Sequence, residues 1–182
     1  MKIRKLYRIE SAHIVKGAVS QRCSNSYHGQ SGVIEVFLTS NGLDDAGMVY
    51  DFGAFKNTIG SFIDMFDHSV HLSKESVESL VFFTCANSRY VILPCNPTAE
   101  NYAILFRDCI NEILQNVTYT NGEQNVVCTG VRYHETVTGY AESDNNDAKL
   151  YSLSRLEFSK DTLNEASNEI KEIIKKVKGN VN

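Results

Sequence analysis

The sequence predicts an α+β fold, because strand-like and helical segments follow one another without the strict alternation of a parallel α/β protein. Two strand-like segments, residues 2–10 and 33–39, adjoin with no helical pattern between them. Apolar residues further along recur at the spacing of amphipathic helices. The chain has 182 residues, of which 42% are hydrophobic, and this suits one domain with at most a short appendage.

The two N-terminal strands are expected to form an antiparallel pair with a long connection. Residues 2–10 alternate in polarity, and one face carries Ile3, Lys5, Tyr7 and Ile9. Residues 33–39 are rich in the β-branched and aromatic residues that favour strands. Residues 11–31 show little periodicity and are predicted to form a loop.

Two helices are predicted in the middle of the chain, with a strand candidate at residues 90–93 between them. The first helix covers about residues 52–66, with Asp51 as its N-cap. Its apolar face consists of Phe52, Phe55, Ile59, Phe62, Ile63 and Phe66. The second helix starts near Asn96 and Pro97, which suit an N-cap and a first helical turn.

The last third of the chain adds one strand and one extra helix. Residues 126–133 alternate as a strand does. A helix is predicted at about residues 162–178, and a capping-box pattern begins at Thr162. We therefore expect a domain over residues 1–145 and a C-terminal extension over residues 146–182.

Composition argues against several classes of function. The formal net charge of −4 leaves no basic footprint for nucleic acid, and no run of about 18 apolar residues could span a membrane. The basic N-terminus is not followed by a long apolar segment, so we expect no signal peptide. Five cysteines at irregular spacing argue against a disulfide framework and favour the reducing cytoplasm.

Two histidines flank the connection between the N-terminal strands. His13 follows the first strand and His28 precedes the second, so antiparallel pairing would bring them together. Two converging imidazoles can bind a transition metal, and the alternative is a pair of solvated loop histidines. Cys23 lies in the same connection and is either a reactive thiol or a small, buried residue.

Two further polar groups could carry chemistry. Asp67 and His68 follow the first predicted helix, and a carboxylate can orient a histidine for proton transfer near neutral pH. Asp67 could instead form a cap or accept from the backbone. Glu135 ends the last predicted strand, where its carboxylate could accept two N–H bonds from a guanidine-like ring edge. The alternative for Glu135 is a solvent-facing side chain.

Five motifs occur in order between residues 3 and 142. They are Glu10-Ser11-Ala12-His13 with Cys23 to Gln30, Gly47-Met48-Val49-Tyr50-Asp51-Phe52, Phe66-Asp67-His68, Asn96-Pro97-Thr98-Ala99-Glu100-Asn101 and His134-Glu135-Thr136. Each is modest alone, but in this order they resemble the signature of the 6-pyruvoyl-tetrahydropterin synthase and 6-carboxytetrahydropterin synthase family. The resemblance does not extend past about residue 145.

The resemblance implies a T-fold, which is an antiparallel four-stranded sheet with two helices on one face. This chain would add its extra C-terminal helix. The resemblance also implies a homohexamer of two stacked trimers with sites between subunits. It further implies a zinc ion held by three histidines, which grips the side-chain hydroxyls of 7,8-dihydroneopterin triphosphate.

Individual roles follow from the same resemblance. The metal-binding positions are His13, His28 and Gln30. The catalytic positions are Cys23 as the base, with Asp67 and His68 as a second acid/base pair. The substrate-binding positions are Glu135, which would anchor the pterin ring, Thr98 and Glu100.

Gln30 departs from the family pattern, which has a histidine at this position, and Gly32 stands where an aromatic residue is often found. Residues 28 and 30 of an extended chain share a face, but an amide oxygen is a poorer zinc ligand than imidazole. Side chains that could replace Gln30 as a ligand are His71, His68 and Cys23.

The favoured product is 6-carboxytetrahydropterin, on the route to queuosine and other 7-deazaguanines, because the short Cys-to-His loop and the overall brevity of the chain resemble the bacterial branch. One alternative is a pyruvoyl-forming synthase. The other is a catalytically silent, pterin-binding T-fold subunit, which Gln30 would favour.

Overall fold

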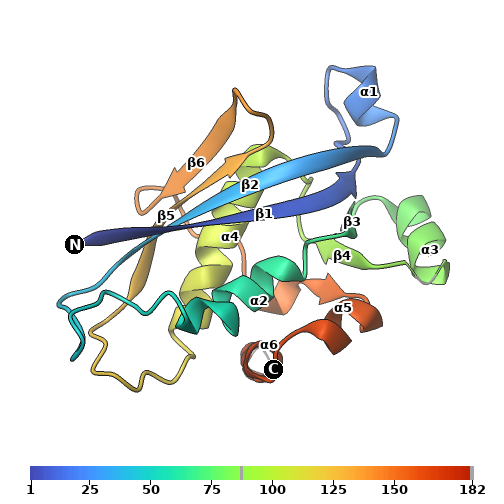
Figure 1. The fold of residues 1–182 in the computed structure, drawn as a ribbon. Coiled ribbons are helices and arrows are strands. Elements are labelled where there is room, and N and C mark those ends of the chain that lie inside the picture. The colour runs from blue at the N-terminus through green and yellow to red at the C-terminus, as the bar shows by residue number, and fades with distance from the viewer. Residues whose placement is uncertain (87, 181–182) are drawn as a thin grey trace.

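The computed structural model describes residues 1–86 and 88–180 and shows an α+β fold. Within these residues one sheet has seven strands: β1 (Lys2–His13), β2 (His28–Thr39), β3 (Ser69–Ser73), β4 (Tyr90–Leu93), β5 (Val127–His134), β6 (Tyr140–Asp144) and β7 (Glu157–Phe158). They lie in the order β6-β5-β2-β1-β3-β4-β7 (Figure 1). The sheet is thus larger than the expected four antiparallel strands, and it is mixed, because β3 is parallel to both β1 and β4.

Three of these strands carry too little pattern to be read from the sequence. β3 has five residues, β6 is mostly polar and β7 has two residues. Pairing with a neighbouring strand, and not the periodicity of side chains, defines each of them.

β1 and β2 form the antiparallel pair that the sequence predicts, but the pair is longer than expected. Its register runs without interruption along all 12 residues of each strand and ends with His13 opposite His28. The loop predicted over residues 11–31 is therefore too long, and the connection is residues 14–27, which include α1 (Gln21–Ser24). The polar end of β1 stays extended because it also pairs with β3.

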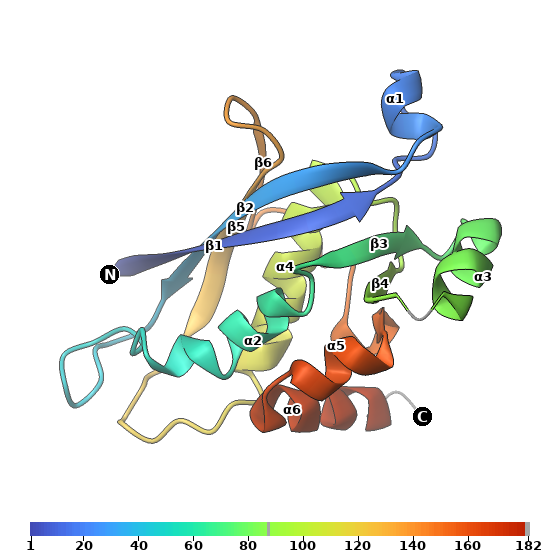
Figure 2. The same cartoon turned by 45° about the vertical axis from the view of Figure 1, so that its right-hand side comes forward.

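The remaining helical segments are η1 (Ala54–Lys56), α2 (Ile59–Asp64), α3 (Val77–Cys85), α4 (Ala99–Leu114), η2 (Leu153–Arg155), α5 (Lys160–Glu165) and α6 (Asn168–Gly179). α2, α4, α5 and α6 lie on one side of the β1–β2 pair, while α1 stands apart at the end of that pair (Figures 1 and 2). α4 packs on β5 and β6, and α2 packs on β1. In the described part of the chain no helix is long and apolar enough to cross a membrane.

The helix predicted over residues 52–66 is broken in two. η1 and α2 meet at Thr58, whose backbone is not helical, with φ −109° and ψ −101°. The Thr58 hydroxyl donates to the Ala54 carbonyl at 2.9 Å and closes the first turn. Asp51 does not cap a helix but accepts from the Gly53 N–H at 2.6 Å. Helical spacing predicted most of the buried face but not the break.

The helix predicted at residues 162–178 is also two helices. The chain leaves α5 at Ala166 with an extended ψ of 151°, and α6 starts anew after Ser167. The N-caps are Ser159 and Ser167, whose hydroxyls accept from the N–H groups three residues on, so the capping box predicted at Thr162 is wrong.

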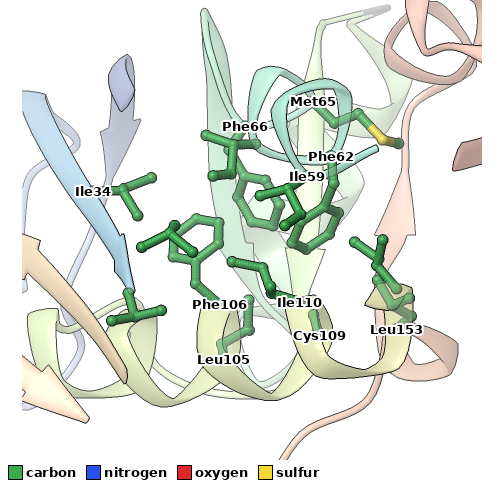
Figure 3. Close-up of a cluster of buried hydrophobic side chains, with 14 of the residues drawn as sticks. Ile34, Ile59, Phe62, Met65, Phe66, Leu105, Phe106, Cys109, Ile110 and Leu153 are labelled. Atoms are coloured by element: carbon green, nitrogen blue, oxygen red, sulfur yellow. The ribbon is translucent and has the colours of Figure 1, made fainter. Parts of the chain in front are cut away.

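One hydrophobic core joins the helices to the sheet (Figure 3). Phe66 after α2 and Phe106 of α4 meet edge to face near its centre, with ring centroids 4.8 Å apart. Leu153 and Ile170 are buried in the same cluster, and β7 extends the sheet beside β4. Each such side chain contributes roughly 1.5–3 kcal/mol by its burial, so residues after 145 help to stabilise the core.

Candidate functional site

His13 and His28 lie side by side at the end of the β1–β2 pair. They are register partners, and their Nε2 atoms are 3.1 Å apart. The His13 ring is fully buried and stacks on Tyr102 of α4, with centroids 6.3 Å apart. The long strands therefore place two imidazoles at one point on the helix-covered face of the sheet.

Both rings are suited to binding a cation. Burial, and secondarily the neighbouring His28, lower the pKa of His13 to about 4, while the Pro97 carbonyl acts in the opposite direction. The ring of His13 is therefore neutral at pH 7. His28 Nδ1 lies 3.1 Å from the Ser26 carbonyl, to which it can only donate. In a neutral ring this leaves the lone pair of His28 Nε2 facing His13.

The spacing of the two Nε2 atoms fits two ligands of a tetrahedral zinc ion. Zn–N bonds of about 2.0–2.1 Å place two such ligands roughly 3.3–3.4 Å apart, close to the observed 3.1 Å. Among the described residues, the buried His13 Nδ1 makes no hydrogen bond of ordinary geometry, although the Pro97 carbonyl is close enough to raise the pKa of the ring. A ligating histidine normally donates this N–H to an acceptor, and the Pro97 carbonyl is the group that could accept it.

Among the described residues no third imidazole has a ring nitrogen free to join this pair, although His71 of β3 is the register partner of His13. Gln30 lies two residues after His28, and its side-chain amide donates to the Glu135 backbone carbonyl. A carbonyl oxygen only accepts, so the NH₂ group of Gln30 faces Glu135. No group of three His, Cys, Asp or Glu side chains within residues 1–86 and 88–180 is arranged to hold a metal. His13 and His28 thus fit as two zinc ligands, and the neutral amide of Gln30 lies near the position of a third.

His71 does not replace Gln30, because both of its ring nitrogens are engaged. Nε2 lies 3.0 Å from the Phe66 carbonyl, to which it donates, and Nδ1 lies 2.5 Å from the Tyr102 hydroxyl, from which it accepts. Burial lowers the pKa of His71 to about 4, so the ring is neutral. His71 connects β3 to α4 and the end of the α2 segment.

Glu135 lies beside the histidine pair, directly after β5. Its Oε1 atom is 3.8 Å from His13 Nε2, and its side chain is 37% exposed. Glu135 and Glu100 line a cavity of about 210 Å³ next to this point. Thr98 caps α4 by accepting from the Asn101 N–H at 3.3 Å, which fixes the turn that carries Glu100. A partly exposed carboxylate at a cavity can accept two parallel N–H donors.

Cys23 lies in α1, within the connection that separates the two histidines. Its carbonyl accepts from the Val15 N–H at 2.8 Å, which ties α1 to the residues just after His13. The side chain is partly exposed and is not in a disulfide. Cys23 and His13 therefore belong to one hydrogen-bonded loop.

Asp67 and His68 lie beside Glu10, about 10 Å along β1 from His13 at the usual rise of a strand. The Glu10 N–H donates to Asp67 Oδ1 at 2.6 Å, and His68 Nδ1 is 2.9 Å from Asp67 Oδ2. Burial raises the pKa of Asp67, but these hydrogen bonds outweigh it and hold that pKa below its usual value. His68 is exposed, with a left-handed φ of 49°. Hydrogen bonds join this pair to Glu10 and not to the two histidines.

The sequence did not indicate that two aromatic side chains, Tyr102 and Tyr133, pack together behind the histidines. No motif singles out Tyr102 of α4, yet its ring stacks on Tyr133 with centroids 4.6 Å apart. A Cβ added at Gly32 would lie 2.6 Å from the Tyr133 hydroxyl oxygen. The small residue at position 32 thus makes room for Tyr133, and the glycine in place of an aromatic residue was the available signal.

Comparisons with known proteins show the family to which the chain is similar. A model of the family described as 6-pyruvoyl tetrahydropterin synthase matches residues 2–146. A protein named 6-carboxy-5,6,7,8-tetrahydropterin synthase from Helicobacter pylori strain J99 is 40% identical over 144 residues, which are 79% of this chain and 72% of the relative. A protein of the same name from Rickettsia conorii is 32% identical over 117 residues, covering 63% of this chain and 80% of the relative.

Solved structures share the fold at lower sequence identity. An uncharacterized protein from Wolinella succinogenes superposes with a TM-score of 0.64 at 19% identity, covering 80% of this chain and 98% of that one. The 6-pyruvoyl tetrahydropterin synthase of Caenorhabditis elegans gives a TM-score of 0.55 at 21% identity, covering 80% and 95%. The expected T-fold is confirmed.

Proposed function

Since the chain belongs to the 6-pyruvoyl tetrahydropterin synthase family, we propose that it is a 6-carboxy-5,6,7,8-tetrahydropterin synthase. This lyase acts on 7,8-dihydroneopterin triphosphate and water and releases triphosphate and acetaldehyde. The names of the Helicobacter and Rickettsia relatives support the carboxy product. Its product would enter the route to queuosine and other 7-deazaguanines, in the cytoplasm.

The observation that carries the proposal is the position of Glu135 next to the histidine pair. Glu135 Oε1 lies 3.8 Å from His13 Nε2, and His13 Nε2 lies 3.1 Å from His28 Nε2. An acceptor for the N–H edge of a pterin ring therefore lies beside two imidazoles that could bind a metal. A pterin held by Glu135 would extend its side chain past the histidines.

His13 and His28 would hold the zinc ion, and the amide of Gln30 could supply only a weak third contact. A bound zinc ion would act as a Lewis acid toward the side-chain hydroxyls of the substrate. The two imidazoles must stay neutral to serve as ligands, and the lowered pKa of His13 meets this requirement.

Cys23, as thiolate, is the base in this proposal, and it removes a carbon-bound proton of the substrate side chain. Asp67 and His68 return protons as a second acid/base pair, with Asp67 fixing the ring at Nδ1. Glu135 accepts from the pterin ring, and Thr98 and Glu100 complete the substrate-binding turn at the start of α4.

We also propose a homohexamer of two trimers, with sites between subunits. Asp67 and His68 lie away from the histidine pair of their own chain, which suits a site assembled from more than one copy. In β1, Ser11–His13 pair with β3, and the N–H and carbonyl of Glu10 are bonded to Asp67 and His68. Among the described residues no strand pairs with this edge of β1 before residue 10, so we propose that a strand of another subunit pairs there.

Two other functions remain as candidates. A pyruvoyl-forming synthase would use the same residues and differ in its product. A catalytically silent, pterin-binding subunit is favoured by one observation, the engagement of Gln30 with the Glu135 carbonyl in place of a third imidazole. Triphosphate release separates the enzymes from the silent subunit.

The test incubates the protein with 7,8-dihydroneopterin triphosphate and zinc and measures triphosphate. We expect catalytic release of triphosphate. The rate of release should fall at least about 100-fold in the His28→Ala variant, in line with the usual contribution of groups that act in the chemical step. A wild-type rate no higher than that of His28→Ala would contradict an enzymatic function and leave the silent subunit.

A further inference from the structure

The chain from Asp144 to Leu153 runs largely beyond the residues that match the family, 2–146, yet buried charges fix its path. Asp108 of α4 is 3% exposed and accepts from the N–H groups of Leu150 and Tyr151 at 2.8 and 3.0 Å. Glu112, 8% exposed, accepts from the Leu153 N–H at 2.8 Å. Buried carboxylates are costly unless they are hydrogen-bonded, so the backbone of this segment is held in one place.

Arg107 holds the first half of the same segment. Its guanidinium donates to the carbonyls of Asp147 and Ala148 at 3.1 and 2.9 Å, and also to that of Asp144. It also pairs with Asp108 at 2.6 Å, so two charges that face this segment balance each other. The tyrosine that follows is therefore presented by a fixed backbone.

Tyr151 uses this position to reach the start of α4. Its hydroxyl donates to Asn101 Oδ1 at 2.6 Å. The NH₂ group of Asn101 donates to the Asn96 carbonyl at 2.9 Å. Because that carbonyl can only accept, the orientation of the Asn101 amide is set, and the phenol must be the donor. Tyr151 thereby fixes the turn of residues 96–101.

Asn96 carries the connection to the histidine. Its side-chain amide accepts from the Lys16 N–H at 3.1 Å and donates to the Lys16 carbonyl at 2.7 Å. Lys16 lies three residues after His13, and the neighbouring Val15 N–H donates to the Cys23 carbonyl at 2.8 Å. One chain of hydrogen bonds thus runs from Tyr151 to the loop that follows His13 and contains Cys23.

We propose that Tyr151 is a positioning residue of the site, acting through Asn101 and Asn96 on the loop of residues 14–18. It touches neither substrate nor metal. It limits the motion of the backbone between His13, the proposed metal ligand, and Cys23, the proposed base, so that the two residues keep their relative positions. The assignment of those two roles rests on the proposed function, but the mechanical link between Tyr151 and the loop does not.

The test compares Tyr151→Phe with Tyr119→Phe. Tyr119 is a matched control, because its partly buried hydroxyl also donates to one acceptor, the Leu114 carbonyl at 2.9 Å, in a part of the chain not linked to this loop. Hydrogen–deuterium exchange is followed in peptides that cover residues 14–18, without substrate. We expect exchange to rise at least about threefold in Tyr151→Phe, since opening free energies report local hydrogen bonding, and to stay unchanged in Tyr119→Phe.

Two further readouts separate positioning from general stability. Tyr151→Phe should weaken zinc binding at least about threefold and lower kcat/KM, because the turn that Tyr151 fixes holds the loop after His13 and also carries Thr98 and Glu100. Asn101→Ala removes the other partner of the same hydrogen bond. Exchange at residues 14–18 should therefore be no faster in the double variant Tyr151→Phe/Asn101→Ala than in Asn101→Ala alone.

Unchanged exchange at residues 14–18 in both Tyr151→Phe and Asn101→Ala would overturn the proposal, even with a lowered Tm. Increased exchange in a protein that proves inactive as a synthase would uphold the link and refute the proposed function instead. The two failures are therefore distinguishable.

Discussion

Gln30 donates its side-chain amide to the backbone carbonyl of Glu135. The residue proposed as a third metal ligand is thus bound to the residue proposed to anchor the pterin ring. An imidazole at position 30 could not make the same bond and bind a metal through the same nitrogen. The contact occupies the NH₂ group of Gln30, so this side chain could offer a metal only its amide oxygen.

Gln30→His should tighten zinc binding. It adds an imidazole on the strand face that already carries His28, and loss of even an outer partner commonly changes metal affinity by about 10–100-fold. We expect a gain of at least about 10-fold in a zinc titration. The control is Gln124→His, where the wild-type amide likewise donates to a backbone carbonyl, that of Leu43, far along the chain. Equal zinc affinity in the wild type and Gln30→His would show that position 30 is not the weak point.

Cys23→Ala should lower the rate and leave substrate binding nearly unchanged. A positioned base contributes about 10²–10⁴-fold, so kcat should fall by at least about 100-fold. Cys85→Ala is the control, because Cys85 is also free and is exposed at the end of α3. Turnover is measured by triphosphate release. Wild-type turnover in the Cys23→Ala variant would show that Cys23 is not the base and is only a small loop residue.

Glu135→Ala should weaken pterin binding more than it slows chemistry. The carboxylate would accept two ring N–H bonds, and hydrogen bonds to charged groups contribute about 1.5–3 kcal/mol each. Affinity for a pterin, measured by fluorescence titration, should fall at least about 10-fold. Glu157→Ala tests the loss of a surface carboxylate, since Glu157 pairs with Lys74 on an exposed edge. Equal pterin affinity in Glu135→Ala and the wild type would remove Glu135 from the binding site.

Stability should rise with pH between about 4 and 6.5. Burial lowers the pKa of both His13 and His71 from 6.5 to about 4. In this window the unfolded chain binds more protons than the folded one, so acidification favours unfolding. The contribution is complete above pH 6.5 and is lost as the pH falls toward 4. Each pKa unit corresponds to about 1.4 kcal/mol, so the two shifts together amount to several kcal/mol.

Urea denaturation of chelator-treated protein at pH 6.5, 5.5 and 4.5 measures this dependence. His71→Gln removes one of the two rings whose pKa is lowered, so the free energy of unfolding should depend less on pH in this variant. Asp67, whose pKa is lowered from 3.8, acts in the same direction but at lower pH. The same free energy of unfolding at pH 6.5 and 4.5 would mean that neither histidine is neutralised by folding.

The sequence predicted the parts of the fold whose side chains carry a period. The β1–β2 pair, α4 and β5 follow from alternation or helical spacing. β3 and β7 do not, because they are short and are defined by their neighbours. The break at Thr58 and the restart at Ser167 depend on backbone hydrogen bonds that a hydrophobic pattern does not record.

The candidate site was predictable only where residues converge along paired strands. His13 and His28 meet because of register, which the antiparallel pair dictates. The contact of Gln30 with Glu135 joins positions 105 residues apart, and the link from Tyr151 to Asn101 joins positions 50 apart. No local pattern encodes such contacts, since the first depends on the pairing of β2 with β5 and the second on the path of the chain after β6.

Product analysis tests the central claim most directly. The protein is incubated with 7,8-dihydroneopterin triphosphate and zinc, and the pterin products and acetaldehyde are identified by mass spectrometry. We predict 6-carboxytetrahydropterin together with equimolar acetaldehyde and triphosphate, all abolished in His28→Ala. Formation of 6-pyruvoyl-tetrahydropterin without acetaldehyde would contradict the account.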